Sequence, residues 1–167
     1  MVGVERATGV LRNALDAALV VGAAELLGIM DSVLEMTLTH LRTRKQFGVA
    51  IGSFQVLQHR AVDMWIQREI TEAVVESAAG VLDGNSASDD LRSATVSGAK
   101  ARASQAALLL CNQSLQLHGA IGFADEYELG LYINRALTLA AFLGNAAQHR
   151  NRFSRLTQID RREQASP

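Results

Sequence analysis

The sequence is short of cysteine, proline and aromatic residues. Its one cysteine, Cys111, leaves no partner for a disulfide and no thiolate cluster for a metal, so we expect a small buried apolar residue there. Its one proline is the last residue, Pro167, so proline interrupts no helix in the interior. Aromatic residues make up 5% of the 167 positions, while alanine and leucine are frequent. This composition favours closely packed helices over a sheet, and we predict an all-α chain.

An excess of charge of either sign is also missing. The 16 basic and 17 acidic side chains leave a net charge of −1 and are interspersed, which disfavours a nucleic-acid surface. A basic tail over residues 150–162 could contact phosphate, although a solvated terminal helix explains it as well. No apolar run approaches the roughly 20 residues of a membrane span, and we find no signal peptide. We therefore expect a cytoplasmic protein without a membrane span.

Apolar positions recur at helical spacing in three long segments. We predict helices at residues 11–42, 53–82, 89–118 and about 144–156, with one more short helix before the last. The first ten residues show no strong pattern. Ser53 is the expected N-cap of the second helix, whose inner face should include Trp65 and Ile70. With no linker and no repeat, we expect residues 1–167 to form one domain, an antiparallel up-down four-helix bundle with a short extra helix.

The usual local signatures of catalysis and metal binding are absent from the sequence. There is no Gly-x-Gly-x-x-Gly after a strand, no Walker loop and no Gly-x-Ser-x-Gly elbow. Helix bundles hold di-metal sites through Glu-x-x-His pairs on facing helices. None of the four histidines has a glutamate three residues before it; they are His40, His59, His118 and His149. We expect no metal site.

Two glycine-containing corners carry the remaining chemistry. One runs from Arg44 to Gly48 after the first helix, and the other from Gln116 to Gly122 after the third. Helices one and three of an antiparallel bundle run in the same direction, so both corners should lie at the same end. They can be two C-terminal caps with a left-handed glycine, and Arg44 then suits the helix dipole. Alternatively, the guanidinium, the amides and the open backbone suit a flat or phosphorylated ligand.

At these corners the sequence resembles the C-terminal domain of acyl-CoA dehydrogenases. The resemblance lies in Arg44-Lys-Gln-Phe-Gly48, Ile51-Gly-Ser-Phe-Gln55 and Gln58-His-Arg-Ala-Val-Asp-Met64, and then in Gln116-Leu-His-Gly-Ala-Ile-Gly122 and Asp125-Glu-Tyr127. Order and separation also match, over about residues 15–155. In that family the bundle follows an N-terminal helical domain and a middle β domain. We therefore expect an isolated C-terminal domain, either a fragment or the product of a truncated gene.

The resemblance implies a FAD site that is shared with a neighbouring subunit. It places Arg44 near the FAD diphosphate and Ala120 where a second glycine is usual, a change that crowds the ligand without blocking it. The residues implied to contact the cofactor are Arg44, Gln46, Phe47, Gln55, Gln116, Gly119 and Ala120.

The family reaction needs a base that this chain does not supply at the customary positions. It removes the α-proton and β-hydride of an acyl-CoA, and a carboxylate takes the proton. The two positions where the family keeps that glutamate correspond here to Leu143 and Ala18. A non-catalytic subunit paired with a catalytic one is the favoured explanation. The alternatives are that another carboxylate serves as the base, or that the substrate is one whose proton is removed by water or another group. Asp16 is a poor substitute because two helical residues rotate a side chain by about 200°.

The sequence thus predicts the C-terminal domain of a FAD-dependent oxidoreductase of acyl-CoA and fatty-acid metabolism, inactive as an isolated chain. The implied partners are an acyl-CoA substrate, its own or partner acyl-CoA dehydrogenase subunits in a dimer or tetramer, and an electron-transfer flavoprotein. The main alternative is a structural or interaction bundle that has lost flavin chemistry. A nucleic-acid binder that uses the basic tail is the third hypothesis.

Overall fold

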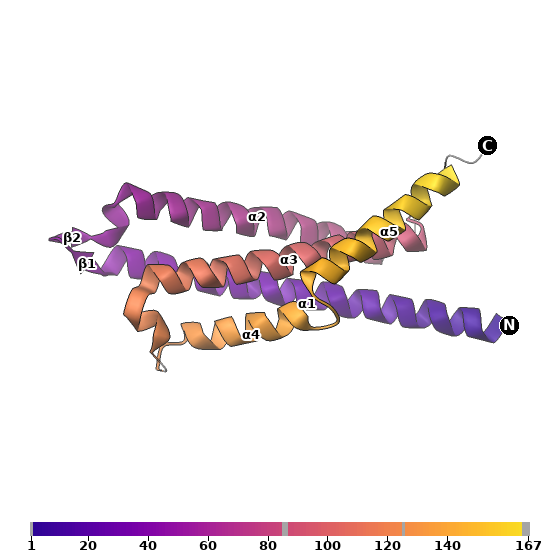
Figure 1. Cartoon of the computed structure of the whole chain (residues 1–167), viewed down its shortest axis with the longest axis horizontal. Helices are drawn as coiled ribbons and strands as arrows, with labels where there is room; N and C mark the ends of the chain where they lie inside the picture. Colours follow the sequence, from indigo (N-terminus) through magenta and orange to yellow (C-terminus); the bar gives the residue numbers. More distant parts are fainter. Residues whose placement is uncertain (1, 85–86, 125, 165–167) are drawn as a thin grey trace.

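The structure, a computed structural model, describes residues 2–84, 87–124 and 126–164 (Figure 1). The elements in chain order are α1 (Val2–Thr43), β1 (Lys45–Gln46), β2 (Val49–Ala50), the 3-10 helix η1 (Ile51–Ser53), α2 (Gln55–Asp83), α3 (Asp89–His118), the 3-10 helix η2 (Gly119–Phe123), α4 (Leu129–Ala141) and α5 (Ala146–Gln164).

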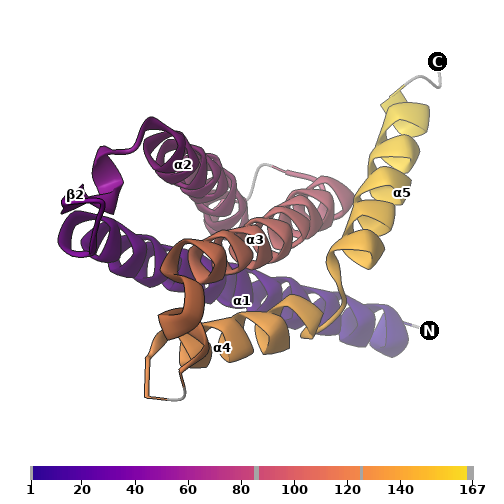
Figure 2. The ribbon, with the colours of Figure 1, turned by 60° about the vertical axis from the view of Figure 1, so that its left-hand side comes forward.

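Helix α3 is the central element of the bundle, since it packs against each of the other four α-helices. The long helices α1, α2 and α3 alternate in direction and lie side by side (Figure 1). Helix α4 returns along α1 and α3, and α5 crosses α3 and leans away from the bundle (Figure 2). The all-α prediction and the up-down four-helix bundle with an extra helix are confirmed.

Small side chains on α3 let the helices approach closely. Ala99, Ala103 and Ala107 are fully buried on α3, so its backbone lies close to its neighbours. Leu26 and Met30 of α1 fill the space that remains and are also fully buried. Each such large side chain contributes about 1.5–3 kcal/mol when it is removed from water. The predicted burial of Cys111 is confirmed, and burial raises the pKa of its thiol to about 11.

Two predicted helix ends are wrong because the helices are longer than their apolar patterns. Helix α1 begins at Val2 rather than near Leu11, and α5 continues to Gln164 past Leu156. Helix α1 over Arg6–Thr43 is also long and apolar enough to cross a membrane by composition, contrary to the sequence-based expectation. Half of its most apolar window is buried in the bundle, as in the core helix of a globular protein.

Helix α2 begins differently from the prediction. Ser53 lies in η1 and donates its hydroxyl to the Ala50 carbonyl at 2.7 Å, and Phe54 is the N-cap without a side-chain bond. The predicted inner face is partly wrong, since Trp65 and Ile70 are 53% and 47% exposed. The stripe that faces the core instead repeats about every 3.5 residues, through Ala61, Met64, Thr71, Val75 and Ala78. Asp125, expected near the start of α4, lies outside the described residues.

Candidate functional site

The first corner is a tight β-hairpin that sequence reasoning did not foresee. Lys45 pairs with Ala50 and Gln46 with Val49, and the two turn residues, Phe47 and Gly48, have φ values of 53° and 82°. Positive φ at both positions is the geometry of a type I′ turn, which matches the twist of the two strands.

Phe47 is a strained and exposed aromatic side chain at the tip of this hairpin. Its left-handed backbone costs about 1 kcal/mol or more. Its ring is 92% exposed and makes an edge contact with Phe54, with ring centroids 6.1 Å apart. Contacts of the ring within the described chain therefore offset little of the free energy that the left-handed backbone of Phe47 costs. Strain that is retained at an exposed aromatic residue points to a contact with another molecule.

Arg44 joins α1 to the hairpin, and its side chain is exposed there. Its backbone N–H donates to the His40 carbonyl at 2.9 Å, and its own carbonyl accepts from Ile51 N–H at 2.8 Å. No acidic side chain among the described residues forms an ion pair with it. The guanidinium is thus free for an external anion. Gln46 and Gln55 are exposed beside it, on β1 and at the start of α2.

The second corner follows α3. Gly119 has a φ of 62°, which only glycine adopts at low cost, and ends the helix. Gly122 is buried, and an added Cβ would lie 3.1 Å from both His118 Cβ and Leu115 Cδ1, so a side chain there would be crowded. Gln116, Gly119 and Ala120 are exposed, and Ala120 needs no positive φ, so its methyl group brings no backbone strain.

The two corners meet at a hollow of about 500 Å³, which confirms that they lie at the same end of the bundle. It is lined by His40, Thr43, Arg44, His118, Ala120 and Ile121. Of the seven predicted contacts, Arg44 and Ala120 line this hollow. The other five are exposed and do not line the hollow. Gln46 and Phe47 lie on the hairpin, Gln55 lies on the first turn of α2, and Gln116 and Gly119 lie at the end of α3.

Two histidines in this wall were missed by the sequence reasoning. His118 is 5% exposed, and its ring lies 4.5 Å from the ring of His40 and 5.2 Å from that of Tyr127. Its Nδ1 lies 2.8 Å from the Ser114 carbonyl, and its buried Nε2 has no hydrogen-bond partner among the described residues. Burial, then the neighbouring His118 and Arg44, lowers the pKa of His40. One signal was available: His40 stands four residues, about one helical turn, before Arg44.

The corner between α4 and α5 carries Leu143, one of the two positions where the resemblance places the base. Leu143 has a φ of 54°, and its carbonyl accepts from His149 Nε2 at 3.1 Å. Lys100 of α3 is fully buried beneath this corner, and its Nζ donates to the carbonyls of Leu139 at 2.9 Å and Gly144 at 3.4 Å. Burial lowers the pKa of Lys100. An apolar side chain is thus held at a rigid, strained corner.

The second customary base position lies in the first half of α1. Ala18 is half-buried there. Asp16 is fully buried, accepts from Ser93 Oγ at 2.5 Å and pairs with Arg152 Nη2 at 2.9 Å. Arg152 in turn donates to Ser97 Oγ at 2.9 Å. The Asp16 carboxylate is committed to this internal network, which agrees with the expectation that it is a poor substitute base.

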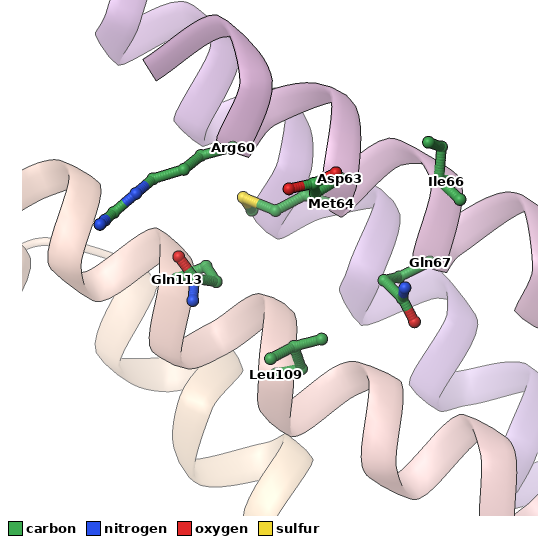
Figure 3. Close-up of a pocket in the computed structure, with 7 residues that line it drawn as sticks. All are labelled: Arg60, Asp63, Met64, Ile66, Gln67, Leu109 and Gln113. Carbon is green, nitrogen blue, oxygen red and sulfur yellow. The ribbon is translucent and has the colours of Figure 1, made fainter. Parts of the chain in front are cut away.

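A groove of about 420 Å³ opens between the first half of α2 and the second half of α3 (Figure 3). Arg60 and Gln67 reach from α2 toward α3, where Leu109 and Gln113 face them (Figure 3). Asp63 is the one acidic residue in this groove, so the groove offers no acid–base pair. Within the described residues no group of three or more His, Cys, Asp or Glu side chains could hold a metal ion.

Comparisons with known proteins match most of the chain to one family. The family model of the acyl-CoA dehydrogenase C-terminal domain matches residues 8–156. Acyl-CoA dehydrogenase IpdE2 of Mycolicibacterium smegmatis is 34% identical over 129 residues, which are 77% of this chain and 39% of that protein. The mitochondrial isovaleryl-CoA dehydrogenase of Arabidopsis thaliana is 34% identical over 127 residues, covering 76% of this chain and 30% of that protein.

Solved structures give the same result. A variant of the Tcur3481-Tcur3483 steroid ACAD superposes with a TM-score of 0.82 at 27% identity, over 87% of this chain and 39% of the other. Butyryl-CoA dehydrogenase from Megasphaera elsdenii shares the fold, with a TM-score of 0.78 at 24% identity over 84% of this chain and 36% of that one. The chain spans less than two fifths of the length of each of these relatives.

Proposed function

Because the chain belongs to the acyl-CoA dehydrogenase family, as its C-terminal helical domain, we propose that it forms one wall of a FAD site and contacts between subunits. The enzyme concerned carries out α,β-dehydrogenation of an acyl-CoA thioester. The observation that carries this proposal is the convergence of two corners, distant in sequence, on one hollow that contains an unpaired arginine.

The residues around the hollow fit a dinucleotide. Arg44 can form a bidentate contact with a diphosphate, because no carboxylate of the described chain occupies it. Phe47 offers an exposed ring for a flat group, with Gln46 beside it. Gln55, Gln116, Gly119 and Ala120 are exposed and are assigned to the rest of the cofactor by the family resemblance. When bound, FAD accepts the hydride; the residues of this chain bind and orient it.

We assign the proton-accepting carboxylate to a partner subunit. Leu143 and Ala18 cannot take a proton, and Asp16 is locked into its pair with Arg152. The chain on its own is therefore expected to form no enoyl-CoA. The proposed partners are acyl-CoA, further acyl-CoA dehydrogenase subunits in a dimer or tetramer, and an electron-transfer flavoprotein. A cytoplasmic location and a single domain over residues 1–167 stay predictions.

Flavin binding tests the proposal. The chain is mixed with FAD, alone and together with a full-length acyl-CoA dehydrogenase subunit, and flavin absorbance is followed through gel filtration. The variant Arg44→Gln should lose the bound flavin. Arg42→Gln, on the last turn of α1 two residues before Arg44 and outside the hollow, should keep it. A colourless assembly that contains the unchanged chain would refute the FAD site.

A structural bundle without flavin chemistry is the second candidate, favoured by the apolar residues at both base positions. Light scattering separates the two. If Arg44→Gln leaves the oligomer unchanged and neither form binds flavin, the chain is an interaction module. If the variant assembles normally but loses flavin, the FAD proposal stands.

A further inference from the structure

Helix α2 carries a second, exposed seam beside the groove that it shares with α3. We call outer seam the five exposed residues that follow one another at spacings of three and four: Val56, His59, Asp63, Ile66 and Ile70. These are the spacings by which one helix pairs with another. The outer seam lies about 120° around the helix from the buried stripe, so α2 can face the core and a second partner at once.

The outer seam and the groove wall expose large apolar side chains. Val56 is 62% exposed and Ile66 39%, and Ile70 is also exposed. Asp63 and Ile66 line the groove, where the half-exposed Leu109 of α3 stands across from them. Apolar side chains that gather on one exposed surface are typical of a surface that binds another protein. The seam therefore has the composition of a contact between chains.

Two opposite charges accompany the seam without pairing with each other. Arg60 stands three residues before Asp63, less than one helical turn away. Figure 3 shows the Arg60 side chain extended along the groove, away from Asp63. Within the part of the chain that the structure describes, neither residue forms an ion pair. Both charges are therefore available to another molecule.

We propose that the outer seam of α2 binds the outer seam of a second copy, antiparallel and about a two-fold axis near position 61. This inference deepens the subunit contacts of the proposed function and rests on them. In this register Asp63 of each copy lies opposite His59 of the other and beside its Arg60. Ile66 of each copy lies opposite Val56 of the other. Every contact is made twice, as a two-fold contact requires.

Charge complementarity favours a second copy as the occupant. Reversing the direction of the seam places the carboxylate of one copy against the basic side chains of the other, and no third molecule is needed to neutralise either. The overlapping residues 53–70 extend about 27 Å along a helix about 10 Å wide. With the groove wall this buries on the order of 400–600 Å² per copy, at the lower end for a specific interface. We therefore expect a dimer with a dissociation constant on the order of micromolar.

Sedimentation velocity of the chain measures this dimer without any flavin. Concentrations from about 1 to 200 µM bracket the expected dissociation constant. The unchanged chain should shift from 18.0 kDa toward twice that mass as its concentration rises. Arg60→Asp and Asp63→Arg should each weaken the dimer at least about tenfold, because each places like charges against each other. Arg155→Asp, the same change at an exposed arginine of α5, should leave it unchanged.

Charge exchange makes the test specific to this register. The double variant Arg60→Asp with Asp63→Arg should dimerise like the unchanged chain, since both reciprocal pairs are restored. A mixture of the two single variants should form mixed dimers in preference to either homodimer. Circular dichroism checks that each exposed substitution leaves the helices intact.

The apolar part of the seam has its own matched pair of variants. Ile66→Ser should weaken the dimer several-fold because it removes the contact with Val56 of the other copy. Trp65→Ser should change it little, because Trp65 is exposed on the same helix but lies outside the seam and the groove. Equal effects of the two substitutions would contradict the proposed face.

The outcomes separate this inference from the FAD site. A chain that stays monomeric at about 200 µM, or that binds only a full-length subunit through this face, overturns the second copy as the occupant. A dimer that ignores both charge reversals, or that the double variant does not restore, overturns the seam. In each case the flavin test with Arg44→Gln is unaffected. Conversely, a dimer that follows the charge pattern while its assemblies bind no flavin keeps the seam and refutes the FAD site.

Discussion

Replacing Asp16 with asparagine tests the reading of this buried carboxylate as a structural group. The carboxylate accepts from Arg152 Nη2 at 2.9 Å and from Ser93 Oγ at 2.5 Å with no exposure to solvent. Hydrogen bonds to charged groups contribute about 1.5–3 kcal/mol each, and asparagine keeps one of them in a neutral form. We expect the free energy of unfolding to fall by about 2–4 kcal/mol.

Thermal and urea unfolding followed by circular dichroism measure this loss. For a chain of this size, 1 kcal/mol corresponds to about 2–4 °C, so the midpoint should drop by roughly 5–15 °C. The variant Asp16→Asn should bind flavin as the unchanged chain does below its unfolding temperature, because the residue is assigned no contact with ligand.

Asp31 provides a matched control. It also pairs with an arginine, Arg68, but its side chain is 50% exposed, and Arg68 keeps its bonds to Glu72. Asp31→Asn should therefore cost less than about 1 kcal/mol. Equal losses in the two variants, or additive losses in the double variant Asp16→Asn with Arg152→Gln, would refute the buried ion pair as a source of stability.

Three further perturbations follow from the described contacts. Phe47→Gly should raise stability by about 1 kcal/mol, because it relieves a positive φ at an exposed tip, and should weaken flavin binding; calorimetry and flavin absorbance measure the two effects. Gly52→Ala should destabilise by about 1–3 kcal/mol, because its Cβ would lie 2.8 Å from the Leu41 carbonyl oxygen; Gly80→Ala, with open space, should stabilise by about 0.4–1 kcal/mol in the same urea assay. Burial lowers the pKa of Lys100 from 10.5, so the folded chain loses this proton before the unfolded chain does, and stability should rise with pH in the alkaline range below 10.5. Urea unfolding at several pH values should show that rise, and Lys100→Met should remove it.

The sequence predicted the long helices well wherever a boundary carries its own signal. Helix α3 begins at Asp89 and ends at His118 as expected, because a turn-forming segment precedes it and Gly119 follows it. The start of α1 was missed because Val2 to Val10 form helix without a clear apolar stripe, so that periodicity gives no warning. Trp65 was placed inside because it is apolar, although it lies about 100° around the helix from the buried Met64.

The site was only partly predictable. Because the first and third helices run in the same direction, the sequence predicted that Arg44 and Ala120 lie at the same end of the bundle, where they line one hollow. This prediction needs no knowledge of side-chain packing. The importance of His118 depends on which of its nitrogen atoms finds a partner, and this is decided by Ser114, His40 and Tyr127 in three dimensions. The hairpin was missed for a different reason, since a left-handed phenylalanine is not one of the Asn-Gly or Asp-Gly signals of a type I′ turn.

Helix α3 also fixes the distance between the Leu143 corner and the hollow. Lys100 near its middle donates hydrogen bonds to the corner that carries Leu143, and His118 at its end lines the hollow. Eighteen residues of α-helix separate them by about 27 Å along the axis. Because the helix is continuous and packs against α1, α2, α4 and α5, this separation cannot change without breaking the helix. Any sliding of α3 along its axis would move both corners by the same amount and in the same direction.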